Sequence, residues 1–312
     1  MEYITLKNSD LKVSRLCMGC CPMGGYGWGA VHESELIDAV NSAVYEGINF
    51  FDTADTYGLG ASERTLGKAL GTRRKDVIIA SKFGVRVGKN GTEYDNSPSW
   101  IRQALDRSLE RLGTDYLDLY QIHYRDGKTP MEEVAGTLQE LRKEGKIRWF
   151  GISNIHRDDI DELLPFRGQL VSFQDEYSLA CRKNEKDMFL LREELGMTPM
   201  TWGSLGQGIL TGKYTIDNAI FDSDDRRSRD IYVNFHGEKL VKNLQIVELL
   251  KEIAAVHNKP VPAVAIRFIL DYIPDSVVLC GVKRQSQMKD NAAGIGWHLN
   301  KEEILLLDEE SR

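Results

Sequence analysis

Short apolar segments alternate with longer segments of helical spacing along most of the chain. Over residues 3–16 apolar and polar residues alternate, with Asn8, Ser9 and Asp10 in the middle, which predicts a β-hairpin. Continuous apolar runs such as 78–83 predict buried strands. Segments such as 97–113, in which apolar residues recur at helical spacing, predict helices.

The order of these segments predicts the fold. After the hairpin we expect eight strands near residues 15–20, 48–54, 76–84, 116–124, 147–154, 170–178, 197–205 and 276–282. Helices are expected near residues 32–47, 62–71, 97–113, 130–146, 156–166, 184–196, 238–258, 261–272, 285–294 and 300–311. A long polar connection separates the seventh strand from the helix that begins near residue 238.

Apolar strands joined by helices imply a parallel sheet covered on its outer face. We therefore predict a (β/α)8 TIM barrel, a single domain over residues 1–312, with an N-terminal β-hairpin and a C-terminal extra helix. A doubly wound open sheet is the alternative, and it usually carries G-x-G-x-x-G after its first strand. The two glycine-rich segments, GYGWGA (25–30) and GLGASE (58–63), lack the third glycine.

Composition narrows the classes of function. The chain has 312 residues and a net charge of −7, and it shows no extended basic run, which argues against nucleic-acid binding. No apolar run reaches the roughly 18–20 residues needed to span a membrane. The start has neither a basic segment nor an apolar core of the kind a signal peptide needs, so a cytoplasmic location is expected. The sequence does not indicate an oligomeric state.

The five cysteines indicate neither a disulfide framework nor a metal site. Their number is odd, and disulfide scaffolds are small secreted chains with paired cysteines. Cys17 and Cys20 form a C-x-x-C pair, but no second pair of Cys or His follows at a spacing typical of zinc. We expect these side chains to pack around the first strand.

The C-terminal ends of the strands carry the chemistry of a barrel. Asp52 ends the second expected strand, with Tyr57 in the loop that follows, Lys82 ends the third, and His123 ends the fourth. Taken singly, each has an ordinary structural explanation, such as a helix cap for Asp52 or a core histidine for His123. Together they predict a convergent site.

The four side chains suggest a site that donates a proton to a carbonyl oxygen of the substrate. A free phenol has a pKa near 10; we expect the ammonium of Lys82 to lower the pKa of Tyr57, and Asp52 to keep Lys82 charged. His123 would bond the substrate oxygen or tune Tyr57. Since no metal set is evident, a hydride would come from an organic cofactor.

Several segments resemble the aldo-keto reductase superfamily, in particular its branch near the potassium-channel β-subunits. The resemblance covers nearly the whole chain, in order and spacing. The matching segments are NFFDTADTYGLGASERTLGKAL (49–70), IIASKFG (78–84), RLGTDYLDLYQIH (111–123), EGKIRWFGISN (144–154), QDEYSL (174–179) and LGQGILTGKY (205–214). It implies the catalytic tetrad Asp52, Tyr57, Lys82 and His123, with Tyr57 as the general acid in reduction.

The resemblance also implies an NADP(H) site. Ser153, Asn154 and Gln174 match residues that hold the nicotinamide carboxamide, and Trp202 matches the aromatic that stacks on its ring. Leu205, Gly206 and Lys213 fall in the loop over the pyrophosphate. In GVKRQSQMKDN (281–291), Lys283 or Arg284 would meet a 2′-phosphate, and Gln287 and Asn291 would lie near it and the adenine. Two adjacent cations favour NADPH over NADH.

The chain departs from the family pattern in two places that matter. Gly203 and Ser204 stand where Ser and Pro are usual, which predicts a looser loop. Arg125 follows the tetrad histidine, and it either faces the substrate mouth, favouring anionic or polyhydroxylated substrates, or is a solvated loop residue. Tyr26 and Trp28 are expected to line that mouth.

These observations favour an NADPH-dependent reductase of an aldehyde, ketone or sugar carbonyl. A regulatory barrel that binds NADPH as a redox sensor with little turnover is a second possibility. A third is an isomerase or hydrolase that uses Asp52 and Asp55 as a carboxylate pair.

Overall fold

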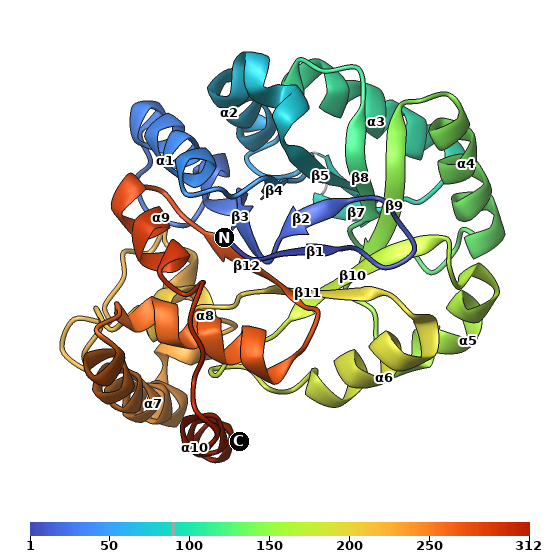
Figure 1. Ribbon diagram of the computed structural model, residues 1–312. Helices are drawn as coiled ribbons and strands as arrows, with labels where there is room; N and C mark the ends of the chain where they lie inside the picture. Colours follow the sequence, from blue (N-terminus) through green and yellow to red (C-terminus); the bar gives the residue numbers. More distant parts are fainter. Residues whose placement is uncertain (89–90) are drawn as a thin grey trace.

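Eight parallel strands close into a barrel in the computed structural model, which describes residues 1–88 and 91–312 (Figure 1). Around the barrel the order is β10-β11-β12-β3-β4-β5-β8-β9. The strands are β3 (Leu16–Gly19), β4 (Phe50–Asp52), β5 (Ile78–Phe83), β8 (Leu117–Ile122), β9 (Ile147–Ser153), β10 (Leu170–Glu176), β11 (Thr198–Trp202) and β12 (Val277–Gly281). The predicted (β/α)8 barrel is confirmed, and each barrel strand lies within an expected segment.

Helices surround the barrel (Figure 1). They are α1 (Glu33–Tyr45), α2 (Ala61–Leu70), α3 (Pro98–Leu112), α4 (Met131–Lys143), α5 (Ile160–Leu163), α6 (Glu185–Leu195), α7 (Gly237–His257), α8 (Val261–Tyr272), α9 (Gln285–Ala292) and α10 (Lys301–Glu310). Local residues explain the boundaries of helix α3. At its start, Ser97 Oγ accepts a hydrogen bond from the backbone N–H of Trp100, and Pro98 occupies the first turn. At its end, Gly113 has a φ of 65°.

Helix α5 is shorter than the helix expected over 156–166. Only Ile160–Leu163 is α-helical, between single 3-10 turns at Arg157–Asp159 and Leu164–Phe166. Pro165 lies two residues after the end of this helix, and proline cannot donate the backbone hydrogen bond that would continue it. The long connection likewise contains only 3-10 turns, at Gly206–Thr211, Arg226–Ser228 and Val233–Phe235.

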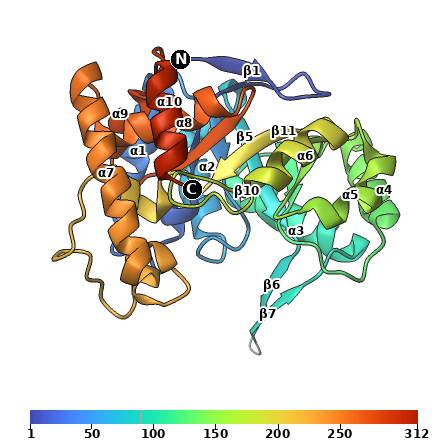
Figure 2. The same ribbon diagram turned by 90° about the horizontal axis from the view of Figure 1, so that it is seen from below.

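The two ends of the barrel carry different hairpins (Figure 2). The predicted N-terminal hairpin, β1 (Tyr3–Thr5) and β2 (Lys12–Ser14), covers the end at which the strands begin. A second hairpin, β6 (Val85–Gly88) and β7 (Gly91–Tyr94), follows β5 directly and projects from the other end. The pattern of apolar and polar positions did not predict this second hairpin.

The apolar core has two parts, as a closed barrel requires. One cluster lies inside the barrel and under the N-terminal hairpin, and it includes Cys17, Phe50 and Leu119, all fully buried. A larger cluster fills the layer between strands and helices and includes Phe51 and Tyr120. Neighbours in sequence thus belong to different clusters, because successive strand side chains point to opposite faces.

No single helix in the described part of the chain is long and apolar enough to cross a membrane. Helices α7 and α8 pass such a test only as a pair, and they are bent by 93° relative to each other.

Candidate active site

Lys82 and Asp52 meet inside the barrel at its C-terminal end. Asp52 is the last residue of β4, and Lys82 lies near the end of the adjacent strand β5. Lys82 Nζ lies 2.5 Å from Asp52 Oδ1, 2.9 Å from the carbonyl oxygen of Thr53 and 3.4 Å from Tyr57 Oη. The ammonium donates to three oxygens, so its burial is compensated.

The other carboxylate oxygen of Asp52 is also occupied. Asp52 Oδ2 accepts from Gln174 Nε2 at 2.6 Å and from Gln121 Nε2 at 3.3 Å. Gln121 faces Lys82 across the β5–β8 pair and is completely buried. Sequence reasoning missed Gln121, and the available signal was a lone amide inside the apolar strand LDLYQI.

A close approach of two loops positions Tyr57. Gly58 has a φ of 60°, and a Cβ built there would lie 2.2 Å from the carbonyl oxygen of Gly24. Glycine at position 58 therefore lets the Tyr57 loop pack on the turn Cys21–Gly24 that follows β3. The phenol is brought above the Lys82–Asp52 pair, and Lys82 Nζ lies 5.1 Å from the centre of its ring.

The expectation that Lys82 lowers the pKa of Tyr57 is wrong for this structure. Burial raises the pKa of Tyr57 well above its usual value, and the nearby Cys21 and Asp52 add to the shift. The physical reason is that Asp52 compensates the ammonium charge at 2.5 Å, whereas the phenol is itself desolvated. Tyr57 is thus held in its protonated form.

His123 packs edge-on against Tyr57. The ring centroids lie 5.9 Å apart at an interplanar angle of 85°, and His123 Nδ1 is buried without a hydrogen-bond partner. Burial, together with the charge of Lys82, lowers the pKa of His123 to about 3. Near neutral pH the imidazole is uncharged and can offer one donor or one acceptor beside the phenol.

A protonated phenol, a buried ammonium and a neutral imidazole therefore converge at one mouth of the barrel. We compared the sequence with those of known protein families. Residues 15–311 match the Aldo/keto reductase family. The chain belongs to this family.

Relatives are similar over nearly their full length. The chain is 33% identical to the aldo-keto reductase YhdN of Bacillus subtilis, covering 97% of this chain and 91% of that protein. It is 30% identical to the NADH-specific methylglyoxal reductase of Escherichia coli, covering 99% and 98%. The structure of the glycerol dehydrogenase AKR11B4 from Gluconobacter oxydans is similar with a TM-score of 0.88 at 34% identity, covering 99% and 94%.

Near the tetrad of this aldo/keto reductase, Ser153 and Asn154 continue the rim. Ser153 Oγ donates to the carbonyl oxygen of Ile122 at 2.8 Å, and Asn154 Nδ2 donates to that of His123 at 2.9 Å. Asn154 has a φ of 56°, a left-handed conformation that asparagine tolerates. Gln174 lies beside Ser153 across the β9–β10 pair. These three candidates are brought to the same rim as the tetrad.

A side-chain hydrogen bond closes the turn at the start of the loop after β11. Trp202 ends β11 and is partly buried. Ser204 is buried, and its hydroxyl donates to the carbonyl oxygen of Thr201 at 2.9 Å. The serine hydroxyl therefore closes this turn with a hydrogen bond, and the looser loop expected from Gly203 and Ser204 stays a prediction. The turn that begins at Gly206 continues toward Lys213, with Leu205 just before it.

Basic side chains gather where the cofactor phosphates were expected. The pKa of Lys283 is lowered by burial and by Arg227, Lys213 and Arg284, and that of Lys213 by burial, Arg227 and Arg284. Mutual repulsion among cations marks a site whose charge suits a phosphate. Arg227 was not singled out from the sequence, since DDRRSRD contains its own acids; Asp225 accepts from Arg227 Nε at 2.8 Å.

The remaining cofactor candidates lie beside these cations. Gln287 Oε1 accepts from the backbone N–H of Lys283 at 2.8 Å, and Asn291 is buried on the same helix, α9. Arg284 is exposed and pairs with Glu35 at 3.1 Å. Of the two adjacent cations, Lys283 therefore lies closer to the interior of the cluster.

Tyr26 and Trp28 lie at the same face. Arg226 lies 4.8 Å from the ring centre of Tyr26 and 5.8 Å from that of Trp28, and its N–H donates to the carbonyl oxygen of Gly27 at 2.9 Å. The carbonyl oxygen of Trp28 accepts from Lys283 Nζ at 2.6 Å. The long connection after β11 is thereby bound to the loop after β3.

Two candidates are not brought into this site. Arg125 donates to both carboxylate oxygens of Glu162, at 2.9 and 3.0 Å, so its charge is compensated by that carboxylate. Asp55 lies near Glu63 and Arg111 rather than beside Asp52, and burial together with Glu63 raises its pKa to about 8. A carboxylate pair formed by Asp52 and Asp55 does not arise.

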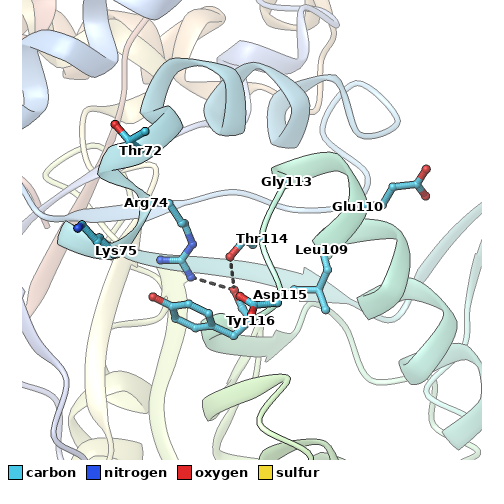
Figure 3. Close-up of a pocket in the computed structure, with 9 residues that line it drawn as sticks. All are labelled: Thr72, Arg74, Lys75, Leu109, Glu110, Gly113, Thr114, Asp115 and Tyr116. Carbon is cyan, nitrogen blue, oxygen red and sulfur yellow. Dashed lines mark hydrogen bonds between the residues drawn. The ribbon is translucent and has the colours of Figure 1, made fainter.

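A hollow of about 630 Å³ lies at the opposite end of the barrel (Figure 3). It lies between the segments that precede β5 and β8, where Arg74 stacks on Tyr116 and donates to its carbonyl oxygen at 2.9 Å. None of the tetrad residues lines it. Among the described residues no group of three or more His, Cys, Asp or Glu could hold a metal ion.

Proposed function

We propose that this aldo/keto reductase reduces the carbonyl group of a small aldehyde, ketone or sugar with NADP(H), and that Tyr57 supplies the proton. The observation that carries the proposal is the buried contact series Asp52–Lys82–Tyr57, with distances of 2.5 and 3.4 Å. This series supports proton donation to an oxygen on which charge develops. It also favours turnover over a purely regulatory role.

The residues divide the work between proton donation and charge stabilisation. Tyr57, kept protonated by burial, donates its proton to the carbonyl oxygen. As the proton leaves, Lys82 Nζ at 3.4 Å stabilises the phenolate that forms. Asp52, with Gln174 and Gln121 on its second oxygen, holds the ammonium in place. His123 offers the substrate oxygen a neutral hydrogen-bonding partner, which orients it toward Tyr57.

The cofactor assignment rests on the donor set. Lys213, Lys283, Arg227 and Arg284 supply charge for the phosphates, and Ser153, Asn154 and Gln174 supply polar groups for the carboxamide. When bound, the nicotinamide supplies the hydride. Trp202 would offer a flat face for its ring. Several cations, with Lys283 in their interior, support NADP(H) over NAD(H), although a relative with 30% identity is named as NADH-specific.

The test is oxidation of NADPH, followed by its absorbance, against a panel of aldehydes, ketones and sugars, repeated with NADH. We expect turnover of at least one carbonyl class and a higher kcat/KM with NADPH. Binding of NADPH without turnover of any compound in the panel would contradict the reductase and favour the regulatory alternative.

A further inference from the structure

A buried carboxylate lies behind Lys82, on the outer side of strand β5. Glu63, in the first turn of α2, is completely buried, and its Oε1 accepts from Ser81 Oγ at 2.6 Å. Ser81 directly precedes Lys82 in β5, and successive strand side chains point to opposite faces. Glu63 therefore binds β5 from the helix layer, at the point where Lys82 extends into the barrel.

Arg111 joins the same carboxylate to the loop that carries Tyr57. It comes from the last turn of α3, which packs beside α2 (Figure 1). Arg111 Nη1 donates to Glu63 Oε2 at 3.0 Å and lies 3.5 Å from the carbonyl oxygen of Asp55, two residues before Tyr57. The guanidinium thus contacts both the carboxylate and the backbone of the loop.

A glycine makes room for Arg111 at the end of the Tyr57 loop. Gly60 has a φ of 86°, and a Cβ built there would clash with Arg111 Nε. The loop therefore packs closely against Arg111, in addition to its close approach at Gly58. Two such contacts leave the loop little freedom to change the 3.4 Å separation between Tyr57 Oη and Lys82 Nζ.

Glu63 supplies the negative charge of this arrangement. Both of its oxygens are bound, whereas Asp55 Oδ1 has no hydrogen-bond partner among the described residues. Burial, together with Glu63, raises the pKa of Asp55 to about 8, so Asp55 is mostly neutral near pH 7. Without the charge of Glu63, Asp55 would ionise more readily beside Arg111 and draw the loop away from its position.

We propose that Glu63 and Arg111 are positioning residues for proton transfer. Their ion pair fixes β5 on one side and the loop of Tyr57 on the other, and so fixes both partners of the contact between Tyr57 and Lys82. This inference rests on the proposed reductase function. Glu63 is sealed from solvent, so it acts through these two side chains and not on the substrate. A misplacement of about 1 Å can lower a reaction rate about 100-fold.

The experiment compares Glu63→Gln with Asp118→Asn, two replacements of a buried, paired carboxylate. Asp118 is 1% exposed, pairs with Arg74 at 2.9 Å and accepts from the backbone N–H of Ile79, near the start of β5. It therefore binds the opposite end of the strand that carries Lys82. The assay follows oxidation of NADPH with the faster substrate of propanal and benzaldehyde.

For Glu63→Gln we expect kcat to fall about 10- to 100-fold, because the phenol and the ammonium are no longer held together. The dissociation constant of NADPH should stay within about 2-fold, since the cofactor candidates lie on other elements. Asp118→Asn should keep kcat within about 2-fold even where it lowers the urea midpoint equally. If Glu63→Gln does not fold, Ser81→Ala carries the test. It keeps the ion pair and removes one hydrogen bond to a charged group, and kcat should fall about 3- to 10-fold.

Amide hydrogen exchange measures the loop without turnover. The N–H groups of Tyr57 and Leu59 donate to the carbonyl oxygens of Ala54 and Thr56, each at 3.2 Å. In Glu63→Gln, or in Ser81→Ala where that variant is used, these amides should exchange faster, by about 10-fold for Glu63→Gln, and Asp118→Asn should leave them within about 2-fold.

The outcomes separate the two proposals. An equal fall of kcat in Glu63→Gln and Asp118→Asn, or unchanged exchange of the loop amides in Glu63→Gln, would overturn the positioning role. Absence of turnover by the unmodified chain contradicts the reductase function instead, and the exchange rates then still decide whether Glu63 and Arg111 hold the loop.

Discussion

The ammonium group of Lys82 lies 2.5 Å from Asp52 Oδ1, and both side chains are almost completely buried. Because Asp52 compensates the ammonium charge, the burial of the phenol dominates and raises the pKa of Tyr57 well above its usual value. With its charge compensated, the ammonium leaves Tyr57 protonated, as an acid must be before it acts. The same ammonium remains 3.4 Å from the phenol oxygen, where it can respond when the proton leaves.

Removing the phenol hydroxyl should stop reduction without disturbing the fold. For Tyr57→Phe we expect kcat to fall by about 10²- to 10⁴-fold, the usual contribution of a positioned general acid. The dissociation constant of NADPH should change by less than about 2-fold, because the ring and its packing on His123 are kept. Steady-state assays and a fluorescence titration with NADPH measure the two effects. Retained turnover would rule out Tyr57 as the proton donor.

Removing the ammonium should destabilise the protein as well as inactivate it. Lys82→Met leaves the carboxylate of Asp52 buried and unpaired, which typically costs about 3–5 kcal/mol. The free energy of unfolding in urea measures this, and adding Asp52→Asn should restore part of the loss. A control is Lys68→Met, which removes an ion pair to Glu33 whose side chains are 60% and 55% exposed. That variant should cost no more than about 1 kcal/mol, and an equal loss in both would show that burial is not the cause.

Sequence reasoning could find the barrel because continuous apolar strands and capped helices are local signals. It could also place Lys82 and His123 at strand ends. The topology of the barrel then brings these strand ends together. Gln121 was missed because its partner Asp52 lies 69 positions away, and an amide in an apolar strand has no local signature. The pKa of Tyr57 was assigned the wrong direction because desolvation depends on tertiary packing.

The hairpin β6–β7 was missed for a different reason. Its residues, Val85–Gly88 and Gly91–Tyr94, are mostly exposed and give little of the apolar alternation on which strand prediction depends. The tetrad candidates lie in segments that the family resemblance names, whereas Tyr94 and Tyr124 come from different segments and become neighbours only in the folded chain. What the sequence leaves open is therefore how side chains from separate loops are arranged around the mouth.

The neutral imidazole of His123 predicts a pH dependence of stability. Its pKa is lowered to about 3 in the folded protein, whereas that of an unfolded chain is near 6.5. Between these values the unfolded state binds more protons, so stability falls as the pH drops from about 6.5 toward 3. Urea unfolding as a function of pH, for the unmodified chain and for His123→Gln, isolates this contribution. We expect the variant to lose less stability over that window, and parallel curves would argue against a neutral His123.

Cofactor preference should depend on the interior cation of the phosphate cluster. Lys283 donates to the carbonyl oxygen of Trp28 at 2.6 Å and is surrounded by Arg227, Lys213 and Arg284. Lys283→Met should raise KM for NADPH about 10-fold, since a charge-assisted hydrogen bond to a phosphate typically contributes about 1.5–3 kcal/mol. KM for NADH, which has no 2′-phosphate, should change by less than about 3-fold. The control is Lys289→Met, which removes an exposed cation from α9, the helix that begins two residues after Lys283. If the two cofactors lose affinity equally, Lys283 acts on the shared part of the dinucleotide, and the preference for NADP(H) has another source.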